Sequence, residues 1–304
     1  MNIRSILLGG TALIVTPILA NAQTMLVEYL FNGTGTTVQN TGTLANADLN
    51  MLNSDNQAAD LYGSAGSGVS GSASDFSFNN TASTGMGTVS GQSFVGGRAE
   101  ASSSFSMDSQ ASFTITGWLN TTALEGSSGN ILDLYNTSGE NPVGVRLSYS
   151  LGSGGTVGSL GLKINGENYP SSTGGGTFHS GGEWVFFAVT YDGTATTNNV
   201  VFYIGDKETS VVKNATRSSA EGTVAFTDAD MTIGNVEGWN GRPFDGMLDD
   251  IRMFGSTTDA SGVLSISEIE AYRAADAIPE PSESAMILGG VLLLLALLRR
   301  RASK

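Results

Sequence analysis

The amino-acid sequence predicts an all-β fold, a two-sheet antiparallel β-sandwich, on three observations. The chain has 304 residues, of which 41 are glycine and only 14% are charged, a composition that supports helices poorly. Its β-branched and aromatic residues form short runs that alternate with a period of two. Gly, Asn, Ser and Asp separate these runs, as in strands joined by tight turns. Local turns between successive strands favour a sandwich over a helix-covered parallel sheet.

The strand pattern recurs along the whole middle of the chain. The gaps contain turn formers such as Asn165-Gly166 and Asp192-Gly193. The predicted strands are 112–119, 131–135, 143–149, 160–164, 184–191, 200–204, 231–234 and 247–254. A short helix is expected at 265–272, with Ser267 as its cap. The stretch 63–97, rich in Gly, Ser and Asn, is expected to form long loops or weakly paired edge strands.

Charge and residue types exclude several functions. The formal net charge is −14, and binding to nucleic acid or to an anionic membrane surface requires Lys and Arg to replace released counterions. We therefore expect no nucleic-acid partner. The chain has no Cys, which excludes disulfides, thiolate metal sites and cysteine catalysis. The single histidine, His179, cannot form a multi-histidine metal site and is expected to be a solvated turn residue.

Residues 1–22 have the pattern of a secretory signal. Arg4 precedes an apolar stretch at 6–19, and a small-x-small sequence follows at its end. Signal peptidase is therefore expected to cleave after Ala22, which leaves a domain at 23–277. A transmembrane anchor is the alternative, and the helix-breaking Pro17 argues against it.

Residues 278–304 have the pattern of a second sorting signal. The segment contains Pro279, Glu280 and Pro281, then an apolar run at 285–298, and then Arg299, Arg300 and Arg301. As a helix this run covers about 21 Å, less than the roughly 30 Å of a hydrocarbon core. The arginines favour the cytoplasmic side of the inner membrane. The order resembles the PEP-CTERM sorting signal, which implies transient anchoring and cleavage by an exosortase. A plain C-terminal membrane anchor is the alternative.

Several sequence blocks between residues 25 and 273 occur in a recognisable order. They are FTITGWLNT at 113–121, EWVFFAVTYDG at 183–193, VVFYIGDK at 200–207, MTIGN at 231–235, FDGMLDDIRMFG at 244–255 and SISEIEAY at 265–272. Together they resemble the laminin G-like, concanavalin A-like jelly roll. The opening LVEYLFNGTGTTVQNTG also resembles the first strand and loop of that family, although Asn40 stands where an aspartate is usual.

The resemblance implies a calcium site, because such domains often bind Ca²⁺ through the opening loop and the closing strand. Asp249 and Asp250 are the leading candidate ligands, and Asn32 and Asn40 are weaker ones. One of two adjacent aspartates in a strand points inward, and a buried carboxylate needs a cation or several donors. The alternative is that Asp249 or Asp250 pairs with Arg252 or accepts backbone N–H bonds.

The tryptophans divide into core and loop residues. Trp118 and Trp184 lie in predicted strands and are expected in the core. Trp239 lies in the loop Gly-Trp-Asn-Gly, where its ring could stack on a sugar or fold back over the sandwich edge. Trp239 is therefore the one candidate ligand-binding residue.

Jelly rolls of this kind include lectins, glycosidases and adhesion modules, so the fold does not define the function. Related catalytic domains carry their carboxylates on a Glu-x-Asp-x-Glu strand, and the nearest sequence here has Asp133 between leucines. We therefore expect a non-enzymatic, exported protein of the cell surface or extracellular matrix that binds carbohydrate or matrix. Its partner would be an extracellular polysaccharide or another surface protein. A purely structural surface protein and a glycoside hydrolase are the alternatives.

Overall fold

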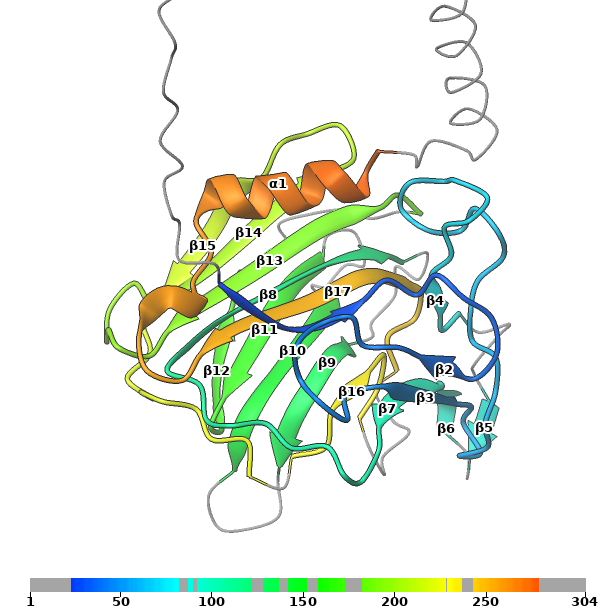
Figure 1. The fold of residues 1–304 in the computed structure, drawn as a ribbon, viewed down its shortest axis with the longest axis horizontal. Helices are drawn as coiled ribbons and strands as arrows, with labels where there is room; N and C mark the ends of the chain where they lie inside the picture. Colours follow the sequence, from blue (N-terminus) through cyan, green and yellow to red (C-terminus); the bar gives the residue numbers. More distant parts are fainter. Residues whose placement is uncertain are drawn as a thin grey trace, which may run out of the picture.

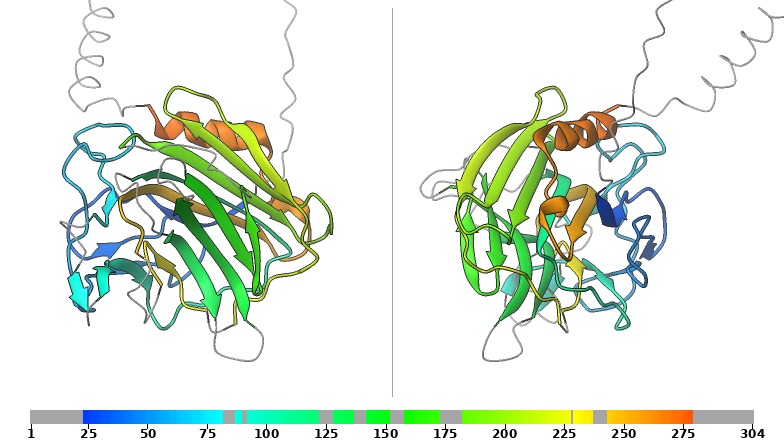
Figure 2. Two further views of the ribbon diagram at one scale, coloured as in Figure 1. Left: turned by 180° about the vertical axis from the view of Figure 1, so that it is seen from behind. Right: turned by 60° about the vertical axis from the view of Figure 1, so that its left-hand side comes forward.

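The structure is a computed structural model, and it describes nine segments of the chain. They are residues 23–81, 87–89, 92–121, 128–136, 142–151, 158–172, 182–227, 229–236 and 243–278. Two antiparallel sheets pack face to face, and one helix covers an outer face (Figures 1 and 2). The predicted all-β sandwich is confirmed.

Sheet 1 has seven strands and contains both the first and the last strand of the domain. Its order is β1 (Thr24–Tyr29), β17 (Met247–Ser256), β8 (Ser112–Asn120), β13 (Val185–Asp192), β14 (Val200–Asp206) and β15 (Val212–Arg217), and β4 (Phe78–Asn79) also pairs with β17. Strand β1 pairs with β17, with Tyr29 opposite Ile251. The two ends of the domain therefore meet within one sheet.

Sheet 2 has eight strands and forms the other layer. Its order is β12 (Glu167–Pro170), β11 (Gly158–Ile164), β10 (Val143–Leu151), β9 (Ser128–Asn136), β16 (Thr232–Ile233), β7 (Arg98–Ala101), β3 (Leu49–Leu52) and β2 (Thr37–Val38). A separate hairpin pairs β5 (Gly87–Val89) with β6 (Gln92–Val95). Strands distant in the sequence, such as β7 and β9, are thus joined through the short strand β16.

The core fills the space between the two sheets. Every second residue of β11 points into it, as the period of two requires. Ile115 of β8 and Val189 of β13 are fully buried in this core, as are Leu132 of β9 and Leu147 of β10. Aromatic rings add contacts, and those of Phe113 and Tyr191 lie 5.2 Å apart.

A second apolar cluster lies on the outer face of sheet 1, beneath α1 (Ile266–Asp276), which follows the 3₁₀ turn η1 (Ala260–Gly262). Its buried members are Val69, Trp118, Trp184, Phe186, Ala188, Val211, Phe254, Leu264 and Ile269. Both Trp118 and Trp184 are buried, as predicted. The helix therefore gives sheet 1 a second apolar layer.

The helix lies where predicted, but its cap is two residues earlier than predicted. Ser265, not Ser267, is its N-cap: the Ser265 hydroxyl accepts the N–H of Glu268, and the Glu268 carboxylate accepts the N–H of Ser265. This reciprocal pair satisfies two otherwise free backbone donors, which a cap at Ser267 would leave unpaired. Among the described residues, no helix has the length and apolar character needed to cross a membrane.

Candidate functional site

A row of polar side chains crosses the outer face of sheet 2. Thr232 lies directly opposite both Asp133 and Glu100, and Arg146 lies directly opposite both Asp133 and Lys163. Residues directly opposite each other in adjacent strands share one face of the sheet. Because their chain neighbours belong to the core, the five side chains face outward. We call Lys163, Arg146, Asp133, Thr232 and Glu100 the polar row.

Asp133 is the buried acid of this row, with 3% of its surface exposed. Its Oδ2 accepts hydrogen bonds from Arg146 Nη2 at 2.9 Å and Nε at 3.1 Å, whereas no described residue meets hydrogen-bond geometry with its buried Oδ1. Burial raises the pKa of Asp133 to about 6, although the charge and hydrogen bonds of Arg146 act in the opposite direction. A carboxyl group with this pKa can carry a proton near neutral pH and donate it.

Glu100 is the second acid of the row and lies on the far side of Thr232. Adjacent strands are about 4.8 Å apart, so the backbones at Asp133 and Glu100 are separated by about 9.6 Å. Arg98 Nε donates to Glu100 Oε2 at 2.6 Å, and the Glu100 side chain is 24% exposed. Inverting glycosidases hold their two carboxyl groups about 6.5–9.5 Å apart, with room for a water molecule between them. The row thus contains a buried acid and a partly exposed carboxylate whose backbones lie two strand spacings apart.

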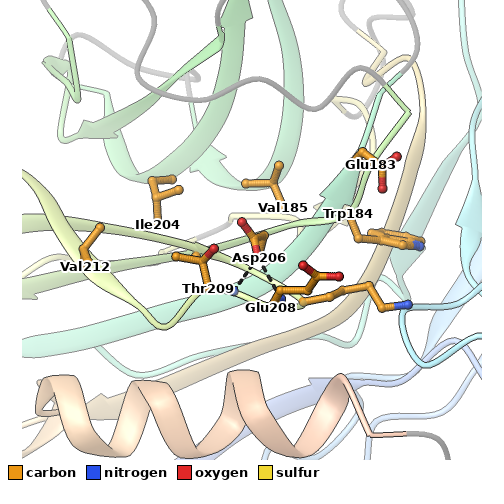
Figure 3. Close-up of a pocket in the computed structure, with 10 residues that line it drawn as sticks. Glu183, Trp184, Val185, Ile204, Asp206, Glu208, Thr209 and Val212 are labelled. Carbon is orange, nitrogen blue, oxygen red and sulfur yellow. Dashed lines mark hydrogen bonds between the residues drawn. The ribbon is translucent and has the colours of Figure 1, made fainter.

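A pocket of about 690 Å³ opens against sheet 1, near α1 (Figure 3). Its lining includes Glu183, Trp184, Asp206 and Glu208. Partial burial raises the pKa of Asp206, but the N–H groups of Thr209 and Glu208 donate to its carboxylate and bring the pKa below its ordinary value. Asp206 therefore closes a turn, and Trp184, only 8% exposed, offers little ring surface for stacking. This pocket is a weaker candidate than the polar row.

The structure places Asp249 and Asp250 on the outer face of sheet 1, in a bulge of β17. Asp249 is fully buried, and its two oxygens accept the backbone N–H groups of Val69 and Asp250, each at 2.9 Å. Burial raises the pKa of both carboxyl groups, and nearby acids raise it further. Asp250 has a φ of +50°, a left-handed conformation that few residues other than glycine adopt.

Arg252 is the cation of this buried cluster. It contacts Glu28 at 2.7 Å, Asp276 at 2.9 Å and Asp250 at 3.4 Å. Asp276 also accepts the indole N–H of Trp118 at 2.9 Å, so helix α1 is fixed to sheet 1 by polar as well as apolar contacts. Asp250 therefore pairs with Arg252, and Asp249 accepts two backbone N–H bonds. These are the partners named in the alternative to a calcium site.

The other two predicted calcium ligands hold loops. The side-chain oxygen of Asn32 accepts the N–H of Phe76, and that of Asn40 accepts the N–H groups of Glu28 and Gly42, all at 2.9 Å. Within the described segments, no three His, Asp or Glu side chains are arranged to hold a metal ion. In this arrangement the four predicted ligands are engaged by other partners, and calcium binding stays a prediction.

Several predicted residues lie outside the described segments. They are His179, Trp239, the cleavage residue Ala22, the motif residues Pro279, Glu280 and Pro281, and the arginines Arg299, Arg300 and Arg301. The apolar run 285–298 lies outside them as well. Their predicted roles in binding and processing remain predictions.

The two-sheet sandwich is that of a concanavalin A-like domain. Residues 92–263, more than half of the chain, match a laminin G-type family model described as the concanavalin A-like lectin/glucanases superfamily. The chain belongs to this superfamily. No curated protein sequence matches the chain.

Solved structures with a similar fold include carbohydrate-active enzymes. Domain 4 of an extracellular GH43 arabinanase from Geobacillus stearothermophilus, in complex with arabinotriose, is 12% identical with a TM-score of 0.52, and the match covers 83% of this chain and 98% of that one. A GH54 α-L-arabinofuranosidase soaked with a cyclic sulfate inhibitor is 9% identical with a TM-score of 0.50, covering 81% and 52%. The chain thus spans nearly all of the arabinanase domain but about half of the arabinofuranosidase. At sequence identities this low, the similarity establishes a shared fold and nothing about activity.

These comparisons correct the functional prediction. The expectation of a non-enzymatic binding protein was wrong because it treated the missing Glu-x-Asp-x-Glu strand as evidence against hydrolysis. Structures that share this sandwich include an arabinanase domain and an arabinofuranosidase. The polar row also brings two acids from different strands to one face, which a search within single strands could not find.

Proposed function

We propose that the domain is a glycoside hydrolase, with Asp133 as general acid and Glu100 as general base of an inverting reaction. One observation carries the proposal: the buried Asp133, whose Oδ1 has no partner of hydrogen-bond geometry among the described residues, has a pKa of about 6, and a salt-bridged carboxylate lies two strands away on the same face. Two carboxyl groups in such different environments suit opposite roles in proton transfer. The arabinanase and arabinofuranosidase of similar fold support arabinofuranosides as the first substrates to test.

The proposed reaction uses the two acids of the row and the arginines paired with them. Asp133 donates its proton to the glycosidic oxygen while the bond from that oxygen to the anomeric carbon breaks. Glu100 removes a proton from a water molecule, whose oxygen forms the new bond to the anomeric carbon from the opposite face. The product is an inverted sugar, and proton exchange with solvent restores both acids. Arg146 holds Asp133, and Arg98 holds Glu100, through the salt bridges described above.

The test measures hydrolysis by the purified chain. Arabinan and 4-nitrophenyl α-L-arabinofuranoside are the first substrates, and NMR reads the anomeric configuration of the product. We expect Asp133→Asn and Glu100→Gln each to lower kcat by about 10²–10⁴-fold, the usual contribution of general acid–base catalysis. The chromogenic substrate has a good leaving group, so Asp133→Asn should affect it less than arabinan.

Glu208→Gln is the matched control, because Glu208 belongs to the pocket of Figure 3 and not to the polar row. It should leave the rate unchanged. Loss of activity in Glu208→Gln with full activity in Asp133→Asn would move the site to the pocket. A folded chain that hydrolyses no glycan of a broad panel would overturn the proposal.

We also propose that the protein is exported and sorted through its two ends, with signal peptidase and an exosortase as processing partners. The support is the order of the sequence features: a signal pattern before residue 23, and the Pro-Glu-Pro motif, apolar run and arginines after Ile278. The protein would then reach the cell surface or extracellular matrix. Mass spectrometry of the protein from its native cells tests this. A mature form that begins near Gln23 and lacks the C-terminal segment is expected, and a mature form that retains both ends contradicts it.

A further inference from the structure

One end of the polar row carries two cations with too few acids to balance them. Lys163 and Arg146 lie directly opposite each other on β11 and β10. Like charges in this position repel and destabilise a sheet. Arg146 is paired with Asp133, whereas Lys163 forms no salt bridge within the described segments. On its other side Lys163 faces Asn168, a neutral residue.

An aromatic ring holds the two cations together. Arg146 Cζ lies 5.0 Å and Lys163 Nζ 5.4 Å from the ring centre of Tyr135. Such cation–π contacts offset part of the repulsion. Tyr135 is two residues along β9 from Asp133, so its ring lies on the same face as the proposed acid.

This arrangement is unusual for the protein as a whole. The chain carries a net charge of −14, yet among the described residues the one salt bridge of this pair joins Arg146 to Asp133, while burial and, to a lesser extent, the charge of Glu167 raise the pKa of Tyr135. Asp133 must also carry a proton for part of the proposed catalytic cycle, and it then neutralises neither cation. A sheet face that keeps two opposed cations, with a partly exposed ring beside them, has the chemistry of an anion subsite.

We propose that the polar row selects an anionic glycan, with a uronate carboxylate bound by Lys163 and Arg146 beside Tyr135. The inference deepens the proposed function and rests on it for the position of the scissile bond. Lys163 lies two strand spacings, about 9.6 Å, from Asp133. The charged sugar unit therefore lies to one side of the bond that Asp133 protonates. At physiological ionic strength, repulsion between the anionic glycan and acidic groups more than about 8 Å away is largely screened. The nearby cations therefore determine whether the carboxylate binds.

The test measures binding separately from hydrolysis. Glu100→Gln is the background, so that the glycan stays intact, and isothermal titration compares polygalacturonate with its fully methyl-esterified, neutral form. We expect at least tenfold tighter binding of the charged polymer, and at least a tenfold loss in Glu100→Gln/Lys163→Glu. Lys213→Glu is the matched control, because Lys213 is an exposed cation on β15 of sheet 1.

The outcomes separate the two proposals. Equal affinity for the two polymers, or equal losses in the Lys163 and Lys213 variants, would overturn the anionic subsite. Binding that depends on Lys163 without hydrolysis by the unaltered chain would uphold the subsite and remove the hydrolase. Hydrolysis of polygalacturonate that Lys163→Met leaves unchanged would do the reverse.

Discussion

The outer faces of the two sheets differ in burial, although the strands of both sheets have the same alternating sequence pattern. Strand β8 of sheet 1 is buried at all nine positions, because α1 and the segment around Val69 cover the face that would otherwise meet solvent. Strand β11 of sheet 2 alternates between buried and half-buried residues, as a sheet with one face toward solvent does. The outer face of sheet 1 has become a second core, whereas that of sheet 2 is half-exposed at β11 and buried at its centre, where Asp133 and Thr232 lie.

The charged groups on the two faces differ in the same way. On sheet 1, Arg252 contacts three acids, and both oxygens of Asp249 accept backbone N–H bonds. On sheet 2, Asp133 keeps an oxygen without a partner, and Lys163 has no salt bridge within the described segments. Satisfied charges stabilise a fold, whereas buried unsatisfied groups cost stability and are characteristic of functional sites.

The largest expected effect comes from removing the cation of the covered face. Arg252→Met leaves Glu28, Asp250 and Asp276 without their shared partner, and breaking a buried ion pair in this way costs about 3–5 kcal/mol. Urea unfolding measures the loss. Lys213→Met, an exposed change on the same sheet, should stay within about 0.5 kcal/mol. A loss below about 1 kcal/mol for Arg252→Met would mean that the helix, and not the charge cluster, carries the stability of this face.

Replacing Asp133 on sheet 2 is expected to change the free energy of unfolding by less, and in the opposite direction. The pKa of Asp133 is raised to about 6 in the folded protein from 3.8, so the folded state holds this proton more tightly than the unfolded state. As pH rises from about 4 to 6, this group therefore lowers the free energy of unfolding. The shift of two pKa units corresponds to at most about 3 kcal/mol. Asp133→Asn should remove this loss of stability and stabilise the protein at pH 7 while lowering kcat.

The difference between the two unfolding curves isolates Asp133, because the buried acids of sheet 1 titrate alike in both proteins. The free energy of unfolding is measured from pH 4.5 to 8 for the parent and the variant. Parallel curves over that range would show that Asp133 is not held with a raised pKa, and would remove it as general acid.

The smallest effect concerns the cap of the covering helix. Ser265→Ala removes the hydroxyl that accepts the N–H of Glu268, at a cost of about 1 kcal/mol. Ser267→Ala, within the first turn, should cost clearly less. Thermal unfolding of both variants compares them, and equal losses would contradict the assignment of Ser265 as the cap.

The sandwich could be predicted because its long central strands carry a clear period of two. Strands β8, β13 and β17 all lie where alternation predicts them. Strands β2, β12 and β15 were not predicted, because they are short or polar and owe their conformation to a neighbouring strand. In the same way, the helix was recognisable from its sequence, but its cap depended on which serine faced Glu268.

The candidate site was less accessible to prediction, and the reason is topological. Asp133 was noticed in the sequence, yet its partner Glu100 lies on β7, a strand of four residues that the alternation did not reveal. The two strands meet only through β16, which is two residues long. Register across three strands so far apart in the chain cannot be read from local pattern.

The pairing of β1 with β17 also governs when the domain can fold during synthesis. Tyr29 meets Ile251 only after more than two hundred intervening residues have been made, and β17 is also the neighbour of β8. Contacts between such distant parts of a chain form slowly. A nascent chain that still lacks β17 cannot complete sheet 1, so the sandwich cannot close until that strand has been synthesised. If the protein is exported as proposed, such a delay would keep the chain able to pass through a translocation channel.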